Sequence, residues 1–261
     1  MRLGGRDALD AVSIALASGE QVALIGPSGA GKTTLLAVLA AALRPTTGRV
    51  LIDGADPWSL PPGRLRALRS RLFLAPQTPP LPPRQRVVTS VLAGRVPQWS
   101  IARALASLWH PRETALARDA LATFSLEDRL WSRVDRLSGG ERQRVALARM
   151  RVSGARLLLV DEPLSALDPT LAEQTMAALT SLARAEGATL VCSLHQVDLA
   201  LKWFPRIFGL REGRCYFDLQ RDAVDAGLID DLYRGDPSAF APVPSDGDAI
   251  DLPLVRVGAC R

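Results

Sequence analysis

One segment of the sequence carries residues whose types and spacing suit phosphate binding. Residues 26–33 read Gly-Pro-Ser-Gly-Ala-Gly-Lys-Thr, which satisfies the pattern G-x-x-x-x-G-K-[ST]. Glycines let the backbone curl so that its N–H groups converge on phosphate oxygens, and a helix that begins near Lys32 directs its positive end at the same anion. The pattern predicts a nucleotide site with ATP and Mg²⁺ as cofactors, formed by Gly26, Pro27, Ser28, Gly29, Ala30, Gly31, Lys32, Thr33 and Thr34.

Within this loop, three side chains are expected to have separate tasks. Lys32 would hold the β- and γ-phosphates as a compact charge, Thr33 would ligate Mg²⁺, and Thr34 would donate to the α-phosphate. The alternative is a chance match to the pattern. Of the 32 basic residues only Lys32 and Lys202 are lysine, and the presence of a lysine at the required position therefore favours a phosphate loop.

A second candidate site follows an apolar run. Residues 157–160 (Leu-Leu-Leu-Val) predict a buried strand, and Asp161 and Glu162 come directly after it. Open α/β sheets bind ligands at the carboxyl ends of their strands. Asp161 would hold Mg²⁺ through water, and Glu162 would orient and polarise an attacking water. Alone, the pair also fits an ordinary turn, but beside a phosphate loop it indicates phosphoryl transfer.

The elements that must position these residues alternate along the chain. Strands are predicted at 21–25, 49–52, 156–160 and 188–194, and helices at 33–43, 88–93, 101–109, 111–124, 137–150 and 171–186. Residues 76–83 hold five prolines and are expected to form a connector without helix or central strand. Alternation of strand and helix implies a parallel sheet with right-handed crossovers.

Composition narrows the class of protein. No apolar run is long enough to cross a bilayer, and the first residues lack the apolar stretch of a secretory signal. Three widely spaced cysteines, Cys192, Cys215 and Cys260, favour neither a disulfide framework nor a zinc site. The net charge of +5 comes from dispersed residues, so a nucleic-acid interface is not indicated and no nucleic-acid partner is expected.

Residues 137–144 read Leu-Ser-Gly-Gly-Glu-Arg-Gln-Arg and resemble the signature of ATP-binding cassette (ABC) subunits. Ser138 also fits an ordinary helix N-cap. The resemblance implies that Ser138, Gly139 and Gly140 bind the γ-phosphate held by the opposite subunit. It further implies that Gln77 contacts Mg²⁺ and water, and that residues 165–168, ending in Asp168, form a loop at the dimer interface. It also implies that His195 contacts the γ-phosphate, although a histidine at this position by itself also fits an ordinary turn. Glu162, His195, Gln77 and Lys32 are thus the expected catalytic residues, and Thr33, Gln77 and Asp161 the expected metal ligands.

The resemblance spans residues 8–235 and implies the fold. We expect an α/β P-loop NTPase core with a mostly parallel sheet, a small antiparallel β subdomain and an inserted helical subdomain at about 78–150. Residues 1–235 would form the ATPase domain, and residues 236–261 a loosely ordered tail. The family's first strand is expected to be missing, and its adenine-stacking aromatic falls near Arg2, whose guanidinium would stack instead. A start of translation further upstream is the alternative.

Residues 193–201, 208–214 and 232–234 are similar to phosphonate import ATP-binding proteins. The resemblance implies an importer ATPase on the cytoplasmic face of the inner membrane. Its partners would be a second copy of itself, transmembrane permease subunits and, indirectly, a periplasmic or lipid-anchored solute-binding protein. The alternatives are an ATPase for another small solute, or a non-transport ABC ATPase that acts in the assembly of phosphonate-degrading enzymes. The interval from Gln77 to Ser138 is too short for the long insertions of DNA-repair ABC proteins.

Overall fold

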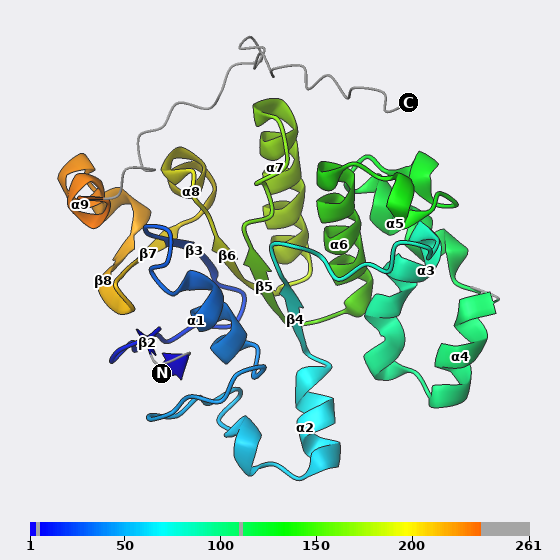
Figure 1. The fold of residues 1–261 in the computed structure, drawn as a ribbon, viewed down its shortest axis with the longest axis horizontal. Helices are drawn as coiled ribbons and strands as arrows, with labels where there is room; N and C mark the ends of the chain where they lie inside the picture. The colour runs from blue at the N-terminus through cyan, green and yellow to red at the C-terminus, as the bar shows by residue number, and fades with distance from the viewer. Residues whose placement is uncertain (4–5, 110–111, 236–261) are drawn as a thin grey trace, which may run out of the picture.

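A six-stranded sheet organises the computed structural model, which describes residues 1–3, 6–109 and 112–235 (Figure 1). The strand order is β4 (Leu72–Ala75), β5 (Leu157–Asp161), β6 (Thr189–Ser193), β3 (Gln21–Ile25), β7 (Arg206–Arg211) and β8 (Arg214–Gln220). The first five strands are parallel and β8 is antiparallel to β7. The predicted tail at 236–261 lies outside the described residues.

Parallel pairing brings the carboxyl ends of distant segments to one edge of the sheet. Asp161 lies opposite Ser193 in the β5–β6 register, and Leu24 pairs with Ser193 one strand further along. The loops after β4, β5, β6 and β3 therefore begin side by side, although more than a hundred residues of chain separate some of them.

Nine α-helices are assigned in the described residues, and the longest are α6 and α7. They are α1 (Lys32–Leu39), α2 (Pro62–Arg69), α3 (Val87–Leu92), α4 (Ile101–Trp109), α5 (Thr114–Ala122), α6 (Gly139–Ser153), α7 (Pro169–Ala185), α8 (Val197–Trp203) and α9 (Ala226–Leu232). The predicted helices at 33–43, 88–93, 101–109, 111–124, 137–150 and 171–186 are confirmed, with ends shifted by several residues. The proline-rich run at 76–83 contains neither helix nor strand, as predicted.

Alternating side chains of the buried strands separate two layers of core. Ala23 and Ile25 pack in a cluster with residues of α6, α7 and α8, whereas Val22 and Leu24 pack in a second cluster with residues of α1. Period-two alternation in a strand that is buried on both faces explains why both sets are apolar. As a result α1 and α6 lie on opposite faces of the sheet (Figure 1).

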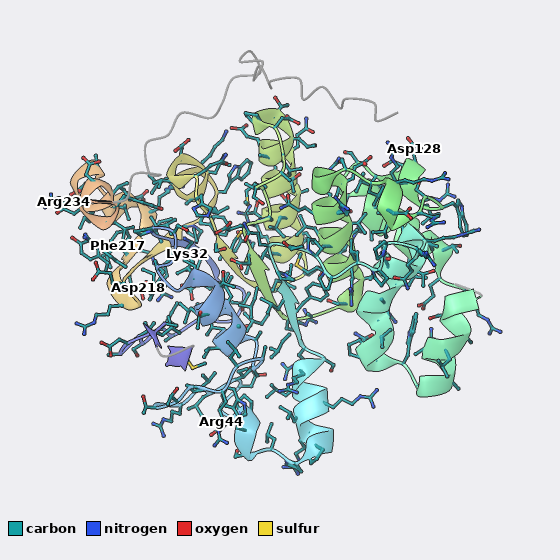
Figure 2. All side chains as sticks on the ribbon, in the orientation of Figure 1. Lys32, Arg44, Asp128, Phe217, Asp218 and Arg234 are labelled. Carbon is teal, nitrogen blue, oxygen red and sulfur yellow. The ribbon has the colours of Figure 1, made fainter. Side chains whose placement is uncertain are left out.

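Helices α3 to α6 form a group between β4 and β5 in the sequence, at one end of the molecule (Figure 1). Their buried contacts come from Val87, Val91, Ala117, Leu121 and Val145. Gly94 permits close approach of the segment after α3 to α6, because a Cβ there would lie 2.3 Å from the carbonyl oxygen of Arg149. Figure 2 shows Asp128 at the far edge of this group and Lys32 near the middle of the molecule.

The small antiparallel β-sheet consists of two short strands. Strands β1 (Arg2–Leu3) and β2 (Arg6–Asp7) form a two-stranded ladder. The prediction of a strand at 49–52 is wrong: there is only an isolated bridge between Ile52 and Ala55, and Leu51 is 53% exposed. The side chain of Arg2, the predicted substitute for an adenine-stacking aromatic, lies outside the described side chains.

Within the described ranges, no helix is long and apolar enough to span a bilayer. Cys192 is buried and Cys215 exposed, and both are free thiols. Burial, together with the nearby Asp161 charge, raises the pKa of the Cys192 thiol far above its ordinary value, so this residue is a packing group and not a nucleophile.

Candidate functional site

The phosphate loop connects the buried strand β3 to α1. Gly26, Gly29 and Gly31 have φ values of 148°, 77° and 104°, a region that side chains with a Cβ disfavour. A Cβ at Gly31 would also lie 2.5 Å from the carbonyl oxygen of Ala8. The loop glycines predicted from the sequence are therefore required by the backbone itself.

Lys32 begins α1, and its side chain is folded back over the loop. It is only 5% exposed, and its Nζ donates to the carbonyl oxygens of Gly26 at 2.7 Å and Pro27 at 3.0 Å. The N-cap of α1, Gly31, provides no side-chain hydrogen bond to the first turn. The start of α1 thus combines a buried ammonium group with backbone N–H groups that no side chain caps. Ser28, Gly29 and Thr33 are exposed along this loop.

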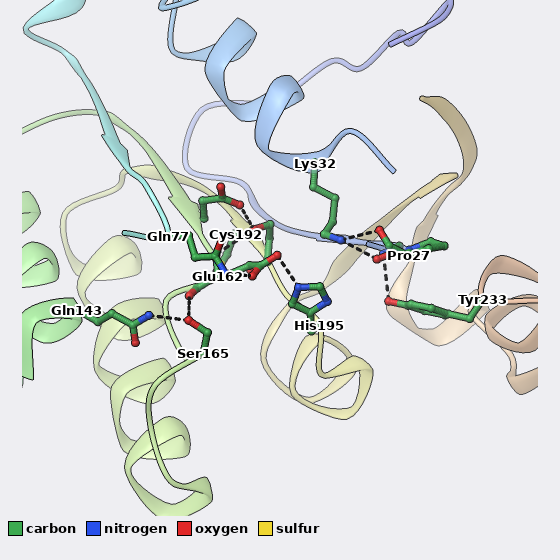
Figure 3. Close-up of polar contacts among 12 residues, drawn as sticks. Pro27, Lys32, Gln77, Gln143, Glu162, Ser165, Cys192, His195 and Tyr233 are labelled. Carbon is green, nitrogen blue, oxygen red and sulfur yellow. Dashed lines mark hydrogen bonds and ion pairs between the residues drawn. The ribbon is translucent and has the colours of Figure 1, made fainter. Parts of the chain in front are cut away.

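Three predicted catalytic residues meet at the neighbouring strand ends. Nε2 of Gln77, which follows β4, donates to Oε2 of Glu162 at 2.7 Å, and Nε2 of His195, which follows β6, lies 2.5 Å from Oε1 of the same carboxylate (Figure 3). The hydrogen bond from His195 lowers the pKa of Glu162. Partial burial opposes this shift, and the charges of His195 and Lys32 reinforce it. Glu162 is therefore ionised near neutral pH.

The backbone around Glu162 is fixed by its neighbour strand. Glu162 has φ of 47°, an uncommon value for a residue with a side chain. Its N–H donates to Oγ of Ser193 at 3.0 Å, and that hydroxyl donates to Oδ1 of the buried Asp161 at 2.6 Å. Ser193 was not singled out from the sequence. Its place at the end of β6, one strand from Asp161, is the signal that could have found it.

The predicted signature lies at the start of α6. Ser138 is the N-cap: its Oγ accepts from the Glu141 N–H at 3.1 Å, and Glu141 in turn accepts from the Ser138 N–H at 2.8 Å. Gly140 is buried against the loop at 165–168, because a Cβ there would lie 2.5 Å from Cδ2 of Leu167 and 2.7 Å from the carbonyl oxygen of Ala166. Ser138 and Gly139 are exposed.

A hydrogen-bonded chain joins this helix to Glu162. Nε2 of Gln143 on α6 donates to Oγ of Ser165 at 2.7 Å, and Ser165 donates to the carbonyl oxygen of Glu162 at 3.3 Å (Figure 3). Asp168 ends the loop and caps α7 by accepting from the Leu171 N–H at 2.9 Å. The structure thus brings Gln77, Glu162 and His195 together with the phosphate loop. The core residues of α6 pack on the opposite face of the sheet from α1.

The oxygen donors of the site suit a hard cation such as Mg²⁺. Asp161 presents a carboxylate, Thr33 a hydroxyl and Gln77 an amide oxygen, which are the ligand types that Mg²⁺ takes together with phosphate oxygens and water. In the described residues, no group of three or more His, Cys, Asp or Glu is arranged to hold a metal by itself.

The chain is similar in sequence to known proteins. Residues 9–165 match the model of the family described as "ABC transporter". The chain is 59% identical to the phosphonates import ATP-binding protein PhnC of Polaromonas sp. (strain JS666), over 87% of this chain and 82% of that protein. It is 47% identical to the protein of the same name in Pseudomonas putida (strain KT2440), over 98% of this chain and 94% of that protein.

Solved structures have the same fold. The chain is similar to the dimeric post-hydrolysis state of the ATP-binding cassette MJ0796 bound to ADP and Pi, with a TM-score of 0.69 and 29% identity over 82% of this chain and 90% of that one. It is also similar to the ADP conformation of MJ1267, an ATP-binding cassette of an ABC transporter. That match has a TM-score of 0.73 and 26% identity over 90% of this chain and 95% of that one.

Proposed function

The chain belongs to the ABC transporter family of ATP-hydrolysing cassettes, and from this membership we propose that it is the ATPase subunit of an importer for phosphonates or related phosphorus oxyanions. The solute class comes from the relatives' name. The observation that carries the ATPase site is the meeting of Gln77, Glu162 and His195 at the sheet edge beside the phosphate loop. Four separate segments converge there, which chance matches to short motifs do not explain.

Lys32 and the loop N–H groups bind the phosphates in this proposal. The Lys32 ammonium already lies over the loop, so only a small movement of a long side chain brings it to the β- and γ-phosphates. Thr34 donates to the α-phosphate. Thr33, Gln77 and, through water, Asp161 would hold Mg²⁺, which would neutralise charge on the phosphate oxygens.

Glu162 orients and polarises the attacking water. In the resting arrangement both of its oxygens accept hydrogen bonds, one from Gln77 and one from His195. A carboxylate held in this way is ionised but weakly basic, because its pKa lies below the ordinary value of 4.5. When His195 turns to the γ-phosphate, Glu162 loses the bond that lowers its pKa most and becomes a better acceptor for a proton from water.

The second half of the site comes from another copy of the chain. The helix α6, which begins with the signature, packs on the sheet face opposite α1, and we infer that a second chain closes its signature over the phosphate loop of the first. Two chains placed head to tail bring each signature to the other's γ-phosphate. The dimeric state of the MJ0796 cassette bound to ADP and Pi supports the formation of a dimer. Asp168 and the loop that it ends would lie along the interface.

Helices α3 to α6 would form the inserted subdomain that moves when the dimer closes. Gln77 links the catalytic carboxylate to the connector that enters this subdomain. Permease helices would receive the movement, with the cassette peripheral on the cytoplasmic face of the membrane and a solute-binding protein acting through the permease.

The experiment is Glu162→Gln, which keeps the shape of the side chain and removes its charge. With Mg²⁺ and ATP the variant should form a stable dimer, seen by size-exclusion chromatography, while hydrolysis falls by about 100-fold or more. Glu173→Gln, on the exposed face of α7, is the matched control and should hydrolyse ATP normally. Unchanged hydrolysis by Glu162→Gln would remove it as the residue that activates water.

The solute is tested by growth. A strain that lacks this chain should fail to grow with a phosphonate as the sole phosphorus source, and the wild-type gene should restore growth where the Glu162→Gln gene does not. Co-purification with a soluble enzyme complex in place of a membrane permease would contradict transport.

A further inference from the structure

The residue that follows helix α9 contacts the phosphate loop. Tyr233 follows α9, is 6% exposed, and accepts a hydrogen bond through its hydroxyl from the backbone N–H of Gly26 at 3.1 Å (Figure 3). Gly26 is the first residue of the loop, at the point where β3 ends. The contact therefore joins two segments that are 207 residues apart at the entrance to the nucleotide site.

Gly26 is held against β7 and needs an acceptor for its N–H. It is buried, and a Cβ on it would lie 2.0 Å from the carbonyl oxygen of Leu210. A buried N–H that lacks an acceptor is strongly disfavoured. On the other side of the same residue, the carbonyl oxygen accepts from Nζ of Lys32 at 2.7 Å. Each polar backbone group of Gly26 therefore has a side-chain partner: the N–H bonds to Tyr233, and the carbonyl oxygen bonds to Lys32.

The hydroxyl of Tyr233 is itself fixed with respect to the sheet. Arg211, the last residue of β7, donates to the carbonyl oxygens of Asp231 at 2.6 Å and of Arg234 at 3.2 Å, one on each side of Tyr233 along the chain. Leu232 is fully buried in the core. The end of α9 is consequently attached to the strand against which Gly26 rests.

We propose that Tyr233 is a positioning residue for the phosphate loop: its hydroxyl holds Gly26 so that the loop is ready for nucleotide before nucleotide binds. The inference rests on the proposed role of the loop in binding ATP. When Lys32 turns from the Gly26 carbonyl toward phosphate, the Tyr233 hydroxyl still accepts from the Gly26 N–H and fixes the loop entrance. Tyr233 touches no reacting atom, so it acts on binding and not on the chemical step.

The test is Tyr233→Phe, which keeps the buried ring and removes only the hydroxyl. The KM for ATP and the Kd for ATP should rise about three- to tenfold, the effect of one lost hydrogen bond, while kcat at saturating ATP changes less than about twofold. Tyr216→Phe is the matched control, because Tyr216 is the other tyrosine of the chain and is 42% exposed on β8. It should leave both constants unchanged.

A purely structural role for the hydroxyl gives a different result. The melting temperature would fall while KM and Kd stay at the wild-type values, and that outcome would overturn the inference. If Tyr233→Phe does not fold, Arg211→Gln replaces it, since loss of the Arg211 bonds releases the end of α9. The same rise in Kd is expected, and an unchanged Kd would again overturn the inference.

Lys32→Ala separates this inference from the proposed function. If Lys32→Ala loses ATP binding and Tyr233→Phe keeps wild-type KM and Kd, only the role of Tyr233 is wrong. If Lys32→Ala also binds ATP normally, the assignment of the loop as the phosphate site is wrong.

Discussion

Two helices of this protein begin with glycine-rich turns, and their starts are constructed in opposite ways. The helix α1 has Gly31 as its N-cap, with φ of 104°, no side-chain cap and no acidic residue in the first turn. The helix α6 has Ser138 as its N-cap, a complete capping box and Glu141 in the first turn. The first start carries a lysine and leaves its N–H groups to a ligand, whereas the second satisfies two of its own N–H groups.

The difference indicates how the proposed composite site is divided. A helix start without a side-chain cap but with Lys32 attracts an anion by itself. The start of α6 has the same dipole, but the Glu141 carboxylate faces its N–H groups and weakens the attraction for a free phosphate. This start has its own side-chain cap, and in the proposed dimer it would contact phosphate only when a second chain presents one. The glycines also differ: Gly31 combines a positive φ with a close contact to Ala8, whereas Gly140 only permits close contact with the loop at 165–168.

The largest effect should come from removing the charge at the first helix start. Lys32→Ala deletes the lysine ammonium at the loop and should weaken ATP binding by about 100-fold, the value of a charge-assisted contact to phosphate. Hydrolysis should be lost with it. Isothermal titration with ATP measures the change, and Lys202→Ala, at the chain's other lysine, is the control. Equal ATP affinity in Lys32→Ala and the control would contradict the first half of the comparison.

A bulky cation at the second helix start should affect a different quantity. Ser138→Arg should lower hydrolysis at least about tenfold and abolish its cooperativity in ATP, because the phosphate of the second chain can no longer approach the N–H groups. ATP binding by the monomer should stay nearly intact. Ser59→Arg, at an exposed serine remote from α6, controls for the added charge. Loss of ATP binding in the Ser138→Arg monomer would contradict the head-to-tail arrangement.

Removing only the Ser138 hydroxyl tests how much this N-cap contributes to the stability of the fold. Ser138→Ala should lower the free energy of unfolding by about 1 kcal/mol, the usual value of a serine N-cap. Urea denaturation of Ser138→Ala beside Ser59→Ala measures it. A loss no larger than in Ser59→Ala would mean that the α6 start, like that of α1, does not depend on its side-chain cap.

Many of the structural features compared above could be predicted from the sequence, because the residues next to each motif indicate the strand or helix that flanks it. A buried strand before Gly26 and a helix after Lys32 follow from an apolar run, a glycine-rich turn and an Ala/Leu-rich segment. The placement of Glu162 and His195 at neighbouring strand ends follows from parallel pairing alone.

The features that could not be predicted correctly depend on contacts between residues that are distant in the sequence. Residues 49–52 have strand-like composition but lie beside no ladder that extends over them, so only one bridge forms. The strand β4 is four residues long and was not predicted, because so short a run before a proline has no detectable period. The bonds of Ser193 and Tyr233 join segments 31 and 207 residues apart, which no local spacing reveals.

The smallest expected effect concerns the pH dependence of the α6 start. The pKa of Glu141 lies below its ordinary value of 4.5: burial raises it, but the bonds from the Ser138 N–H and from Arg129 favour the carboxylate and prevail. A group with a lowered pKa stabilises the fold above its unfolded pKa, and this contribution is lost as pH falls through the folded value. Between about pH 5 and pH 3 the wild type should therefore lose more stability than Glu141→Gln, by less than about 1 kcal/mol.

Arg129→Gln, which removes one partner of the Glu141 carboxylate, should lose stability with pH at an intermediate rate, as measured by urea denaturation at each pH. Parallel curves for all three proteins would mean that the acidic first turn does not stabilise α6, and the contrast with α1 would then rest on Ser138 alone.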